Sequence, residues 1–251
     1  MAGSDDSRQG RDGARIVAAR GGGAVSAEID AFLRQVAAAP QHGPAPGGSG
    51  RGRLIFAMDA TASRRQTWDE AQRIQADMFR TTAALGGLDI QLVYFRGLGE
   101  CRASSWVSDG RTLQKLMRQV DCVGGHTQIE RVLNHTLAET RDCRVNALVY
   151  VGDCLEEDPD NIAVRAGDLG LQGVPIFAFQ EGADAAAQAC FREMARITRG
   201  AYCAFDHSSA EVLRQLLTAV AAYAAGGLKA LEAYGRDAGS SEVRLLIGQL
   251  R

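Results

Sequence analysis

The sequence has no apolar stretch near its N-terminus long enough for a secretory signal peptide, and no later apolar run reaches the uninterrupted length of a membrane span. Residues 1–25 combine Gly, Arg, Asp and Ser with few large apolar side chains, so burial cannot repay the entropy cost of ordering them. We therefore expect a flexible N-terminal tail, a cytoplasmic location and no membrane partner.

The chain also lacks a strong excess of either charge. Its formal net charge is -2, so there is no overall basic field to attract nucleic acid. Neither GxGxxG nor GxxxxGK[ST] follows a predicted strand, which argues against the two common nucleotide-binding loops. We expect no nucleic-acid partner.

No CxxC pair is present, and no Cys and His residues have the spacing of zinc ligands. In a chain without a secretory signal, the six cysteines are expected to be free thiols, mostly buried. Cys154 directly follows Asp153, where a redox-sensitive thiol or a small apolar filler would fit, and the filler is the favoured interpretation.

What the sequence does contain is an alternation of short apolar runs with longer segments of helical periodicity. This pattern predicts parallel strands joined by crossover helices, in an open doubly wound α/β sheet of Rossmann-like type with helices on both faces. One weaker strand is expected at an edge, antiparallel to the others. The predicted strands are 54–58, 88–95, 103–107, 146–151, 174–179 and 202–205, and the predicted helices are 64–85, 113–120, 129–140, one after Pro159, 185–199 ended by Gly200, and one capped by Ser208 and Ser209.

The length and the 46% hydrophobic content are sufficient for one sizeable domain with short extensions. Ser26 is predicted to cap a short amphipathic helix, and the Pro- and Gly-rich stretch from Pro40 to Arg53 is predicted to be a linker. The predicted organisation is a tail (1–25), a helix with its linker (26–52), the main domain (53–225) and a helical appendage with pieces at 228–234 and 243–250 (226–251).

Three polar segments follow predicted strands or begin a predicted helix. The first strand runs into Asp59-Ala60-Thr61-Ala62-Ser63, the loop 123–127 ends in Gly-Gly-His-Thr, and the fourth strand ends in Gly152-Asp153. Ligands of open α/β sheets bind outside the carboxyl ends of the strands, so these segments are expected to converge. All three offer oxygen donors.

Mg²⁺ prefers octahedral oxygen coordination, keeps several waters and takes one or two carboxylates. The predicted ligands are two carboxylates and three hydroxyls, namely those of Asp59, Asp153, Thr61, Ser63 and Thr127, with Mn²⁺ or Ca²⁺ as alternatives to Mg²⁺. Each segment also has a purely structural interpretation, because Asp, Thr and Ser are ordinary helix caps and Gly124-Gly125 could be only a tight turn. Those interpretations are compatible with metal binding.

Taken together, the DxTxS after an apolar strand, the GGxT loop and the later GD resemble the metal-ion-dependent adhesion site of von Willebrand factor A domains, in their intracellular bacterial form. The resemblance covers about residues 52–225. It departs from the usual DxSxS at Thr61, whose extra methyl stiffens χ1 while the hydroxyl is kept. The resemblance implies that one coordination position is filled by a partner's Asp or Glu.

Beside this site, three residues are expected to form a rim that contacts the partner: His126, Glu156 and Glu157. His126 is expected to be a loop residue and not a ligand, because Mg²⁺ disfavours imidazole. The acidic run that begins at Glu156 is either a solvated helix start favoured by the dipole or a surface that selects basic residues of the partner.

The predicted function is therefore a non-enzymatic, Mg²⁺-dependent protein-binding module. By resemblance, its partner is an AAA+ ATPase or another chaperone-like machine. Two alternatives stay open. One is a Mg²⁺-dependent phosphatase or phosphotransferase using Asp59, although haloacid-dehalogenase-like enzymes need a second Asp where this chain has Thr61. The other is a metal-free scaffold that binds through its C-terminal appendage.

Overall fold

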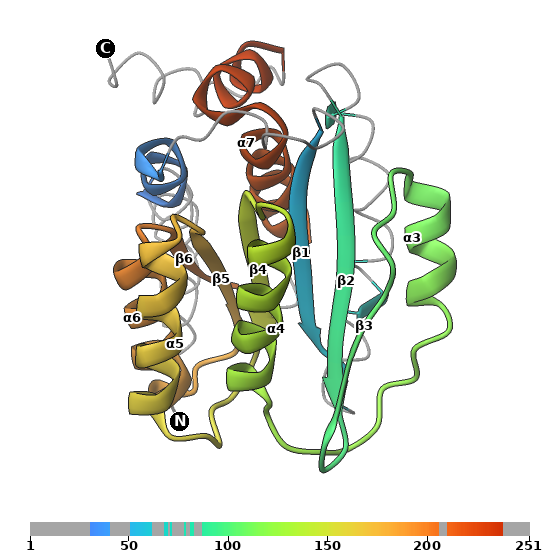
Figure 1. Ribbon diagram of the computed structural model, residues 1–251, viewed down its shortest axis with the longest axis vertical. Coiled ribbons are helices and arrows are strands. Elements are labelled where there is room, and N and C mark those ends of the chain that lie inside the picture. The colour runs from blue at the N-terminus through green and yellow to red at the C-terminus, as the bar shows by residue number, and fades with distance from the viewer. Residues whose placement is uncertain are drawn as a thin grey trace, which may run out of the picture.

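A computed structural model describes residues 31–40, 51–61, 68, 69, 71, 78, 81, 82, 87–205 and 210–237. Six strands form one sheet in the order β3-β2-β1-β4-β5-β6, parallel except for the antiparallel edge strand β3 (Figure 1). This confirms the predicted doubly wound α/β class. The strands are β1 (Gly52–Asp59), β2 (Leu88–Arg96), β3 (Glu100–Ala103), β4 (Ala147–Gly152), β5 (Ile176–Glu181) and β6 (Ala201–Phe205).

Helices cover both faces of the sheet. One face packs against α4 (Ile129–Asp142), α5 (Pro159–Leu171) and α6 (Ala185–Thr198). The other packs against α3 (Gly110–Met117), α7 (Ala210–Asp237) and a helix over residues 31–38. The predicted helix 64–85 falls mostly outside the described residues. Its described positions are helical, and Trp68 and Met78 are buried in the core on the α7 side of the sheet.

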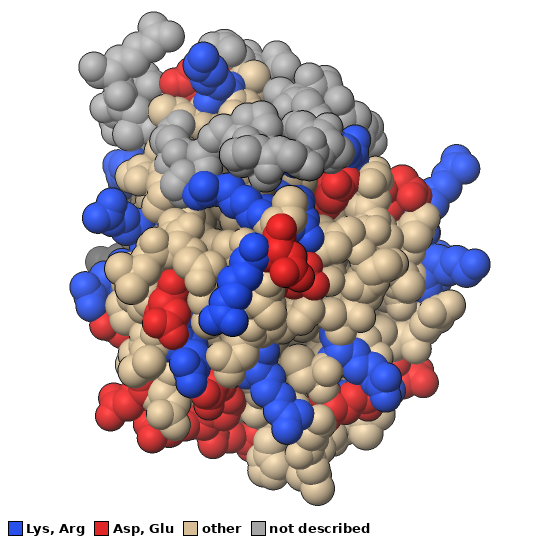
Figure 2. All heavy atoms as spheres, in the orientation of Figure 1, with Lys and Arg blue, Asp and Glu red and all other residues tan. Residues whose placement is uncertain are grey.

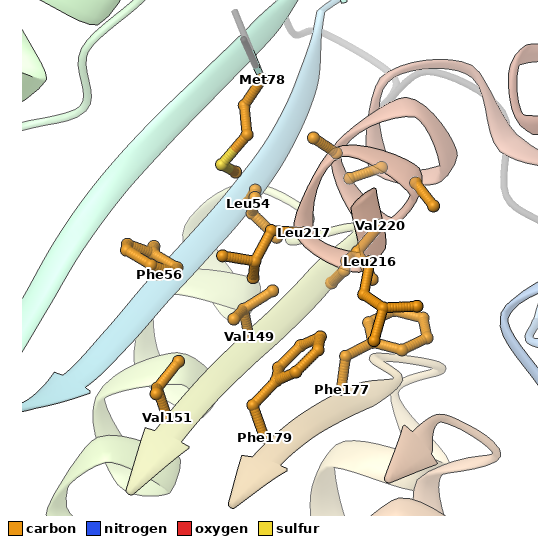
Figure 3. Packing of buried hydrophobic residues seen from close by; sticks show 14 of the residues in the cluster. Leu54, Phe56, Met78, Val149, Val151, Phe177, Phe179, Leu216, Leu217 and Val220 are labelled. Carbon is orange, nitrogen blue, oxygen red and sulfur yellow. The ribbon is translucent and has the colours of Figure 1, made fainter. Parts of the chain in front are cut away.

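The buried strands alternate their side chains between two cores. Phe56, Val149 and Phe179 point to the α7 side of the sheet, into the same core as Leu216 and Val220 (Figure 3), while their neighbours in sequence face the other helical layer. Strands covered on both faces read as continuous apolar runs, as these do. The central strands β1 and β4 are thereby fixed, and their carboxyl ends lie at the same edge of the sheet.

The edge strand differs from the prediction. It was expected at 103–107, but β3 ends at Ala103, and Val107 makes only an isolated bridge to Ile90. The tight turn after Arg96 brings Glu100 directly opposite it, so pairing begins at once. Beyond the strand, Trp106 turns to pack its ring 3.8 Å from the guanidinium carbon of Arg53.

The end of α6 is also built differently from the prediction. Arg199, and not a glycine, is the residue in the left-handed conformation, with φ of 55°. Gly200 is required for another reason, because a Cβ there would lie 1.9 Å from the carbonyl oxygen of Ile176. The glycine permits a close approach between the α6–β6 connection and β5.

The helix 31–38 packs against the main domain. Its residues Phe32, Leu33 and Val36 are buried in the same core as α7. The predicted cap Ser26, the stretch 41–50, Ser63, the caps Ser208 and Ser209, and the piece 243–250 lie outside the described residues.

Helix α7 is kinked where a break was predicted, at Gly226 and Gly227, and it continues to Asp237. Within the described part of the chain, its segment Leu213–Tyr234 is the one helix long and apolar enough to cross a membrane by composition, with a mean hydropathy of 1.2. Burial accounts for that composition, since 67% of the segment's most apolar window lies inside the fold.

Candidate metal-binding site

Asp59 is the last residue of β1 and its side chain is fully buried. Its Oδ1 accepts a hydrogen bond of 2.7 Å from the backbone N–H of Thr61, itself a buried residue. The chain between them is held to the sheet by the N–H of Ala60, which donates to the carbonyl of Phe95 at 2.9 Å. The Asp59 carboxylate and the Thr61 backbone are thus fixed at the carboxyl end of the central strand.

The loop after α3 is tied to the same edge. The N–H of Val123 donates to the carbonyl of Ala60 at 3.0 Å, and that of His126 donates to the carbonyl of Gly97 at 3.0 Å. Gly125 has no room for a side chain, because a Cβ there would lie 2.1 Å from the backbone nitrogen of Gly97. These contacts set the position of the buried Thr127 just before α4.

The end of β4 completes the arrangement. Met58 of β1 is paired with Val151 of β4, so Asp59 and Asp153 follow neighbouring parallel strands at one edge. The thiol of Cys154 responds to both carboxylates: burial, together with the charges of Asp153, Asp59 and Glu156 and a hydrogen bond to Asp153, raises its pKa to about 12. The two predicted carboxylate ligands therefore lie at the same edge of the sheet.

Glu156 joins the loop to the β4–α5 connection. Its carboxylate accepts a 2.9 Å hydrogen bond from the N–H of Thr127, and its own N–H donates to the Thr127 hydroxyl at 3.1 Å. The same carboxylate lies 3.1 Å from Nδ1 of His126, whose side chain is 63% exposed. A hydroxyl oxygen has two lone pairs, so Thr127 keeps one acceptor position beyond its bond to Glu156.

Glu157 lies at the N-terminus of α4. Its carboxylate accepts hydrogen bonds from the N–H groups of Ile129 and Glu130, while the N-cap residue Gln128 makes no side-chain cap. A carboxylate at this end of a helix is favoured by the unpaired N–H groups and the dipole. Figure 2 shows acidic side chains gathered at the lower left of the molecule, where α5 begins in Figure 1.

Four of the five predicted ligands are thus described and lie at one edge, and Ser63 lies outside the described residues. Among the described residues there is no group of three or more His, Cys, Asp or Glu side chains placed to hold a metal. An ion at this edge would depend on hydroxyls together with two carboxylates. The predicted donors are all oxygen atoms, a set that suits Mg²⁺.

No protein-family model matches the sequence, and no curated protein matches it. Solved structures do match. The von Willebrand factor type A structure from Catenulispora acidiphila has a TM-score of 0.53 and 15% identity, covering 68% of this chain and 43% of that one. The SpRpn10 VWA domain has a TM-score of 0.50 and 13% identity, covering 68% and 94%. The fold is that of a von Willebrand factor A domain.

A third neighbour with this von Willebrand factor A fold is proximal thread matrix protein 1 from the mussel byssus, solved with a zinc-occupied MIDAS motif. Its TM-score is 0.53 at 13% identity, over 68% of this chain and 46% of that one. The chain spans less than half the length of the first structures it matches. At these identities the likeness establishes the fold alone.

The hydrogen bonds from Glu156 and Glu157 to the start of α4 were not predicted. Sequence spacing gave no signal for them, because their partners lie 29 and 28 residues earlier in the chain. The first two members of the acidic run, which was predicted as a rim, hold the Thr127 loop and the start of α4 in this structure.

Proposed function

We propose that this protein is a protein-binding module that acts through a divalent metal, Mg²⁺ in the first place, at the carboxyl edge of its sheet. The observation that supports the proposal is that three separate segments lie at the edge of the sheet where the buried Asp59 ends β1. The von Willebrand factor A fold of its structural neighbours supports a role in protein interaction.

Asp59, Asp153 and the hydroxyls of Thr61, Ser63 and Thr127 are the proposed ligands. When bound, the ion would supply the positive charge that attracts an Asp or Glu side chain of the partner. Two carboxylates at most neutralise a divalent ion, so the site can still favour an incoming anion. Thr127 offers its free lone pair, while its bonds to Glu156 hold the loop in place.

His126, Glu156 and Glu157 are proposed as the rim around the bound partner. The side chain of His126 is exposed, and that of Glu156 is 40% exposed. The Glu156 carboxylate accepts the Thr127 N–H and has further lone pairs. A basic residue of the partner, next to the Asp or Glu that binds the metal, would pair with these lone pairs.

We propose that the protein is not an enzyme. Of the haloacid-dehalogenase pattern it has only Asp59, the position two residues on is Thr61, and its two lysines lie on α3 and α7. A cytoplasmic AAA+ ATPase or a related machine is the proposed class of partner, by analogy with intracellular proteins of this fold.

The first test is a thermal unfolding measurement with MgCl₂ or with EDTA, combined with a phosphatase assay on p-nitrophenyl phosphate. A binding module gives a higher Tm with Mg²⁺ and no turnover. Turnover that requires Asp59 would establish the phosphatase alternative. An unchanged Tm would favour the metal-free scaffold.

The second test is co-purification of partners from a native lysate with wild type, Thr127→Ala and Thr127→Ser. Thr127→Ser keeps the hydroxyl and should retain the partner, whereas Thr127→Ala should lose it, and EDTA should release it from wild type. Thr127→Ala also loses the acceptor for the Glu156 N–H, so its stability should fall by about 1 kcal/mol. Undiminished capture in EDTA would overturn the metal-bridged mechanism.

A further inference from the structure

A groove with a volume of about 690 Å³ lies along the outer edge of β6, at the opposite end of the sheet from β3. The helix 31–38 forms one wall and α6 forms the other; Figure 1 shows both on the flank of the molecule that carries β6. Tyr202, Cys203 and Ala204 of β6 line it between the two walls. It is a channel along an edge strand.

The groove is positively charged. Arg192, Arg196 and Arg199 line it, and none of the lining residues that the structure describes is acidic. Arg196 is paired with Glu193 at 2.6 Å. Arg192 lies over the ring of Tyr202, 4.9 Å from its centre, and within the described part of the chain neither Arg192 nor Arg199 has an ion pair. Two exposed guanidinium groups are thus available to a ligand.

The backbone of β6 offers hydrogen bonds in the same groove. Residues of a strand point their N–H and C=O groups alternately to the two sides. The carbonyl of Phe205 faces the β5 side, where it accepts from Gly182, and the N–H of Tyr202 faces outward, where the Gln35 side chain accepts it at a long 3.4 Å. By this alternation the N–H of Ala204 also faces the groove.

We propose that this groove binds an extended acidic peptide segment of a partner protein, which adds to β6 as a further strand. Main-chain hydrogen bonds to Tyr202 and Ala204 supply the pairing, as in other cases of strand addition to a sheet edge. Acidic side chains of the peptide meet Arg192 and Arg199, and guanidinium groups bind carboxylates in a two-pronged geometry. The long contact from Gln35 is given up to the peptide.

The observations favour a peptide over nucleic acid. The basic groups are confined to one wall of a groove in a chain whose net charge is -2, while nucleic-acid binding usually rests on a broad basic surface. An edge strand facing the groove matches the backbone of a peptide and not that of an oligonucleotide. The surface is also distinct from the proposed metal site.

The test uses the full-length protein in EDTA, so that the proposed metal site cannot contribute. Fluorescence anisotropy is measured with three labelled peptides of about seven residues, a usual strand length, that alternate Val with Glu, Gln or Lys. The Glu peptide should bind at least about tenfold more tightly than the Gln peptide, and the Lys peptide should not bind. Equal binding of the Glu and Gln peptides would show that Arg192 and Arg199 do not recognise acidic side chains.

Two changes separate the charge from the pairing. The double variant Arg192→Glu/Arg199→Glu should weaken binding of the Glu peptide at least about tenfold, whereas Arg118→Glu, at the end of α3, should leave it unchanged. N-methylation of alternate amides of the Glu peptide should abolish binding without altering the protein. Retained binding of the methylated peptide, or equal binding by a thymidine oligonucleotide of the same charge, would overturn strand addition.

Discussion

Asp59 is a carboxylate without solvent exposure, and such a group is costly unless hydrogen bonds or a cation compensate its charge. The Thr61 N–H supplies one hydrogen bond to it. A bound divalent ion would supply further compensation. A bound ion is therefore expected to stabilise the fold mainly by compensating the buried charge of Asp59.

We predict that Asp59→Asn abolishes the stabilisation by Mg²⁺ and leaves the metal-free domain folded. The amide oxygen of Asn can still accept the Thr61 N–H, so local structure is kept while the ligand charge is lost. At a concentration 100 times Kd, a ligand stabilises the folded state by about 2.7 kcal/mol, which a melting curve resolves. The measurement is Tm with and without MgCl₂, and an unchanged Mg²⁺ response in the variant would contradict the ligand assignment.

Thr61→Ser is predicted to keep the Mg²⁺ response. The substitution restores the commoner hydroxyl residue and leaves the backbone N–H that donates to Asp59. Removing a buried methyl should lower the free energy of unfolding of the metal-free protein by about 1 kcal/mol. Thr61→Val, which keeps the shape and loses the hydroxyl, is the matched control and should lose metal affinity in isothermal titration. A Ser variant that cannot bind would show that the methyl sets the site geometry.

Single residues could be predicted where a short motif carries the chemistry. Asp59 and Thr61 are two positions apart and follow an apolar strand, so their placement at the sheet edge could be read locally. The role of Glu156 could not, because it depends on the β4–α5 connection meeting a loop nearly thirty residues earlier.

At the scale of elements, the loop that delivers Thr127 depends on a glycine in contact with another glycine. Gly125 touches the backbone of Gly97, whereas a Cβ at Gly124 would meet nothing within 4 Å. We predict that Gly125→Ala destabilises the fold by about 1–3 kcal/mol, as overpacking does, and weakens Mg²⁺ binding by displacing Thr127. Gly124→Ala is the matched control and should do neither. Chemical denaturation and titration with Mg²⁺ measure both effects.

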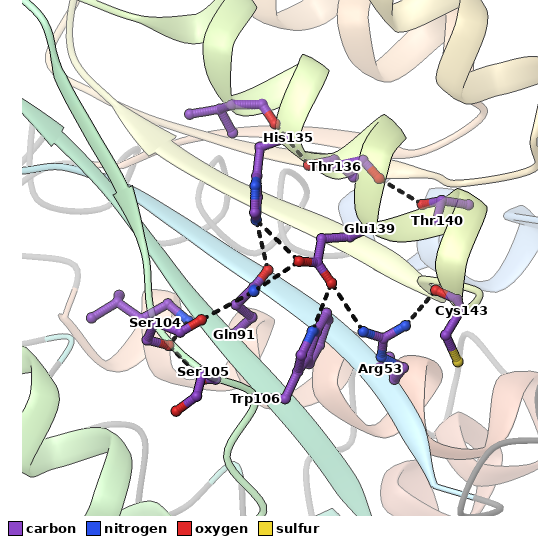
Figure 4. A network of polar contacts seen from close by, with 12 residues as sticks. Arg53, Gln91, Ser104, Ser105, Trp106, His135, Thr136, Glu139, Thr140 and Cys143 are labelled. Atoms are coloured by element: carbon purple, nitrogen blue, oxygen red, sulfur yellow. Dashed lines mark hydrogen bonds and ion pairs between the residues drawn. The ribbon is translucent and has the colours of Figure 1, made fainter.

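Helix α4 is joined to the sheet by a polar network (Figure 4). Glu139 accepts hydrogen bonds from Trp106 at 2.8 Å, Arg53 at 3.1 Å and Gln91 at 3.2 Å. The nearby His135 bonds to Gln91 through Nε2 at 2.8 Å. Burial lowers the pKa of His135 below its usual 6.5 despite the attraction of Glu139. The neutral imidazole is therefore the form that the fold prefers.

This network predicts a loss of stability on acidification. An unfolded His binds its proton near pH 6.5, and the folded His135 binds it only at lower pH, so its contribution is complete above 6.5 and is lost as the pH falls through the folded pKa. We expect Tm to fall between pH 7.5 and 5.5, and to fall less in His135→Gln. Melting curves in EDTA across this range provide the test, and identical slopes for the two proteins would refute it.

Elements were predictable where hydrophobic periodicity was strong. The buried strands and α4 to α6 agree with their predicted ranges to within a few residues, because continuous apolar runs and regular apolar faces mark them. The edge strand β3 has no buried apolar face, since its residues are exposed or half-buried, so pairing at the Arg96–Glu100 turn decided its position. The role of Gly200 after α6 could not be predicted, because it depends on the close approach of the chain to Ile176 of β5, a contact between distant residues.

At the scale of the whole molecule, the sheet needs a cover over β5 and β6 that α7 alone does not provide. The helix 31–38 contributes it: the ring of Phe32 lies 5.1 Å from that of Phe179 and 6.3 Å from that of Phe177. Tyr223 of α7 donates a hydrogen bond to the carbonyl of Pro40. A helix that precedes a Pro- and Gly-rich stretch in sequence is therefore part of the core.

This packing predicts that the stable unit begins before the helix and not at residue 53. Phe32→Ala removes a ring that is 1% exposed and should cost about 3–5 kcal/mol, lowering Tm by about 6–20 °C. Arg34→Ala, at an exposed position of the same helix, should change Tm little. Removal of residues 1–40 should be at least as damaging as Phe32→Ala, because it exposes Phe177 and Phe179 as well as losing the helix. Equal Tm for the Phe32→Ala variant and wild type would show that the helix merely rests on the sheet, and the groove along β6 would then lose one of its walls.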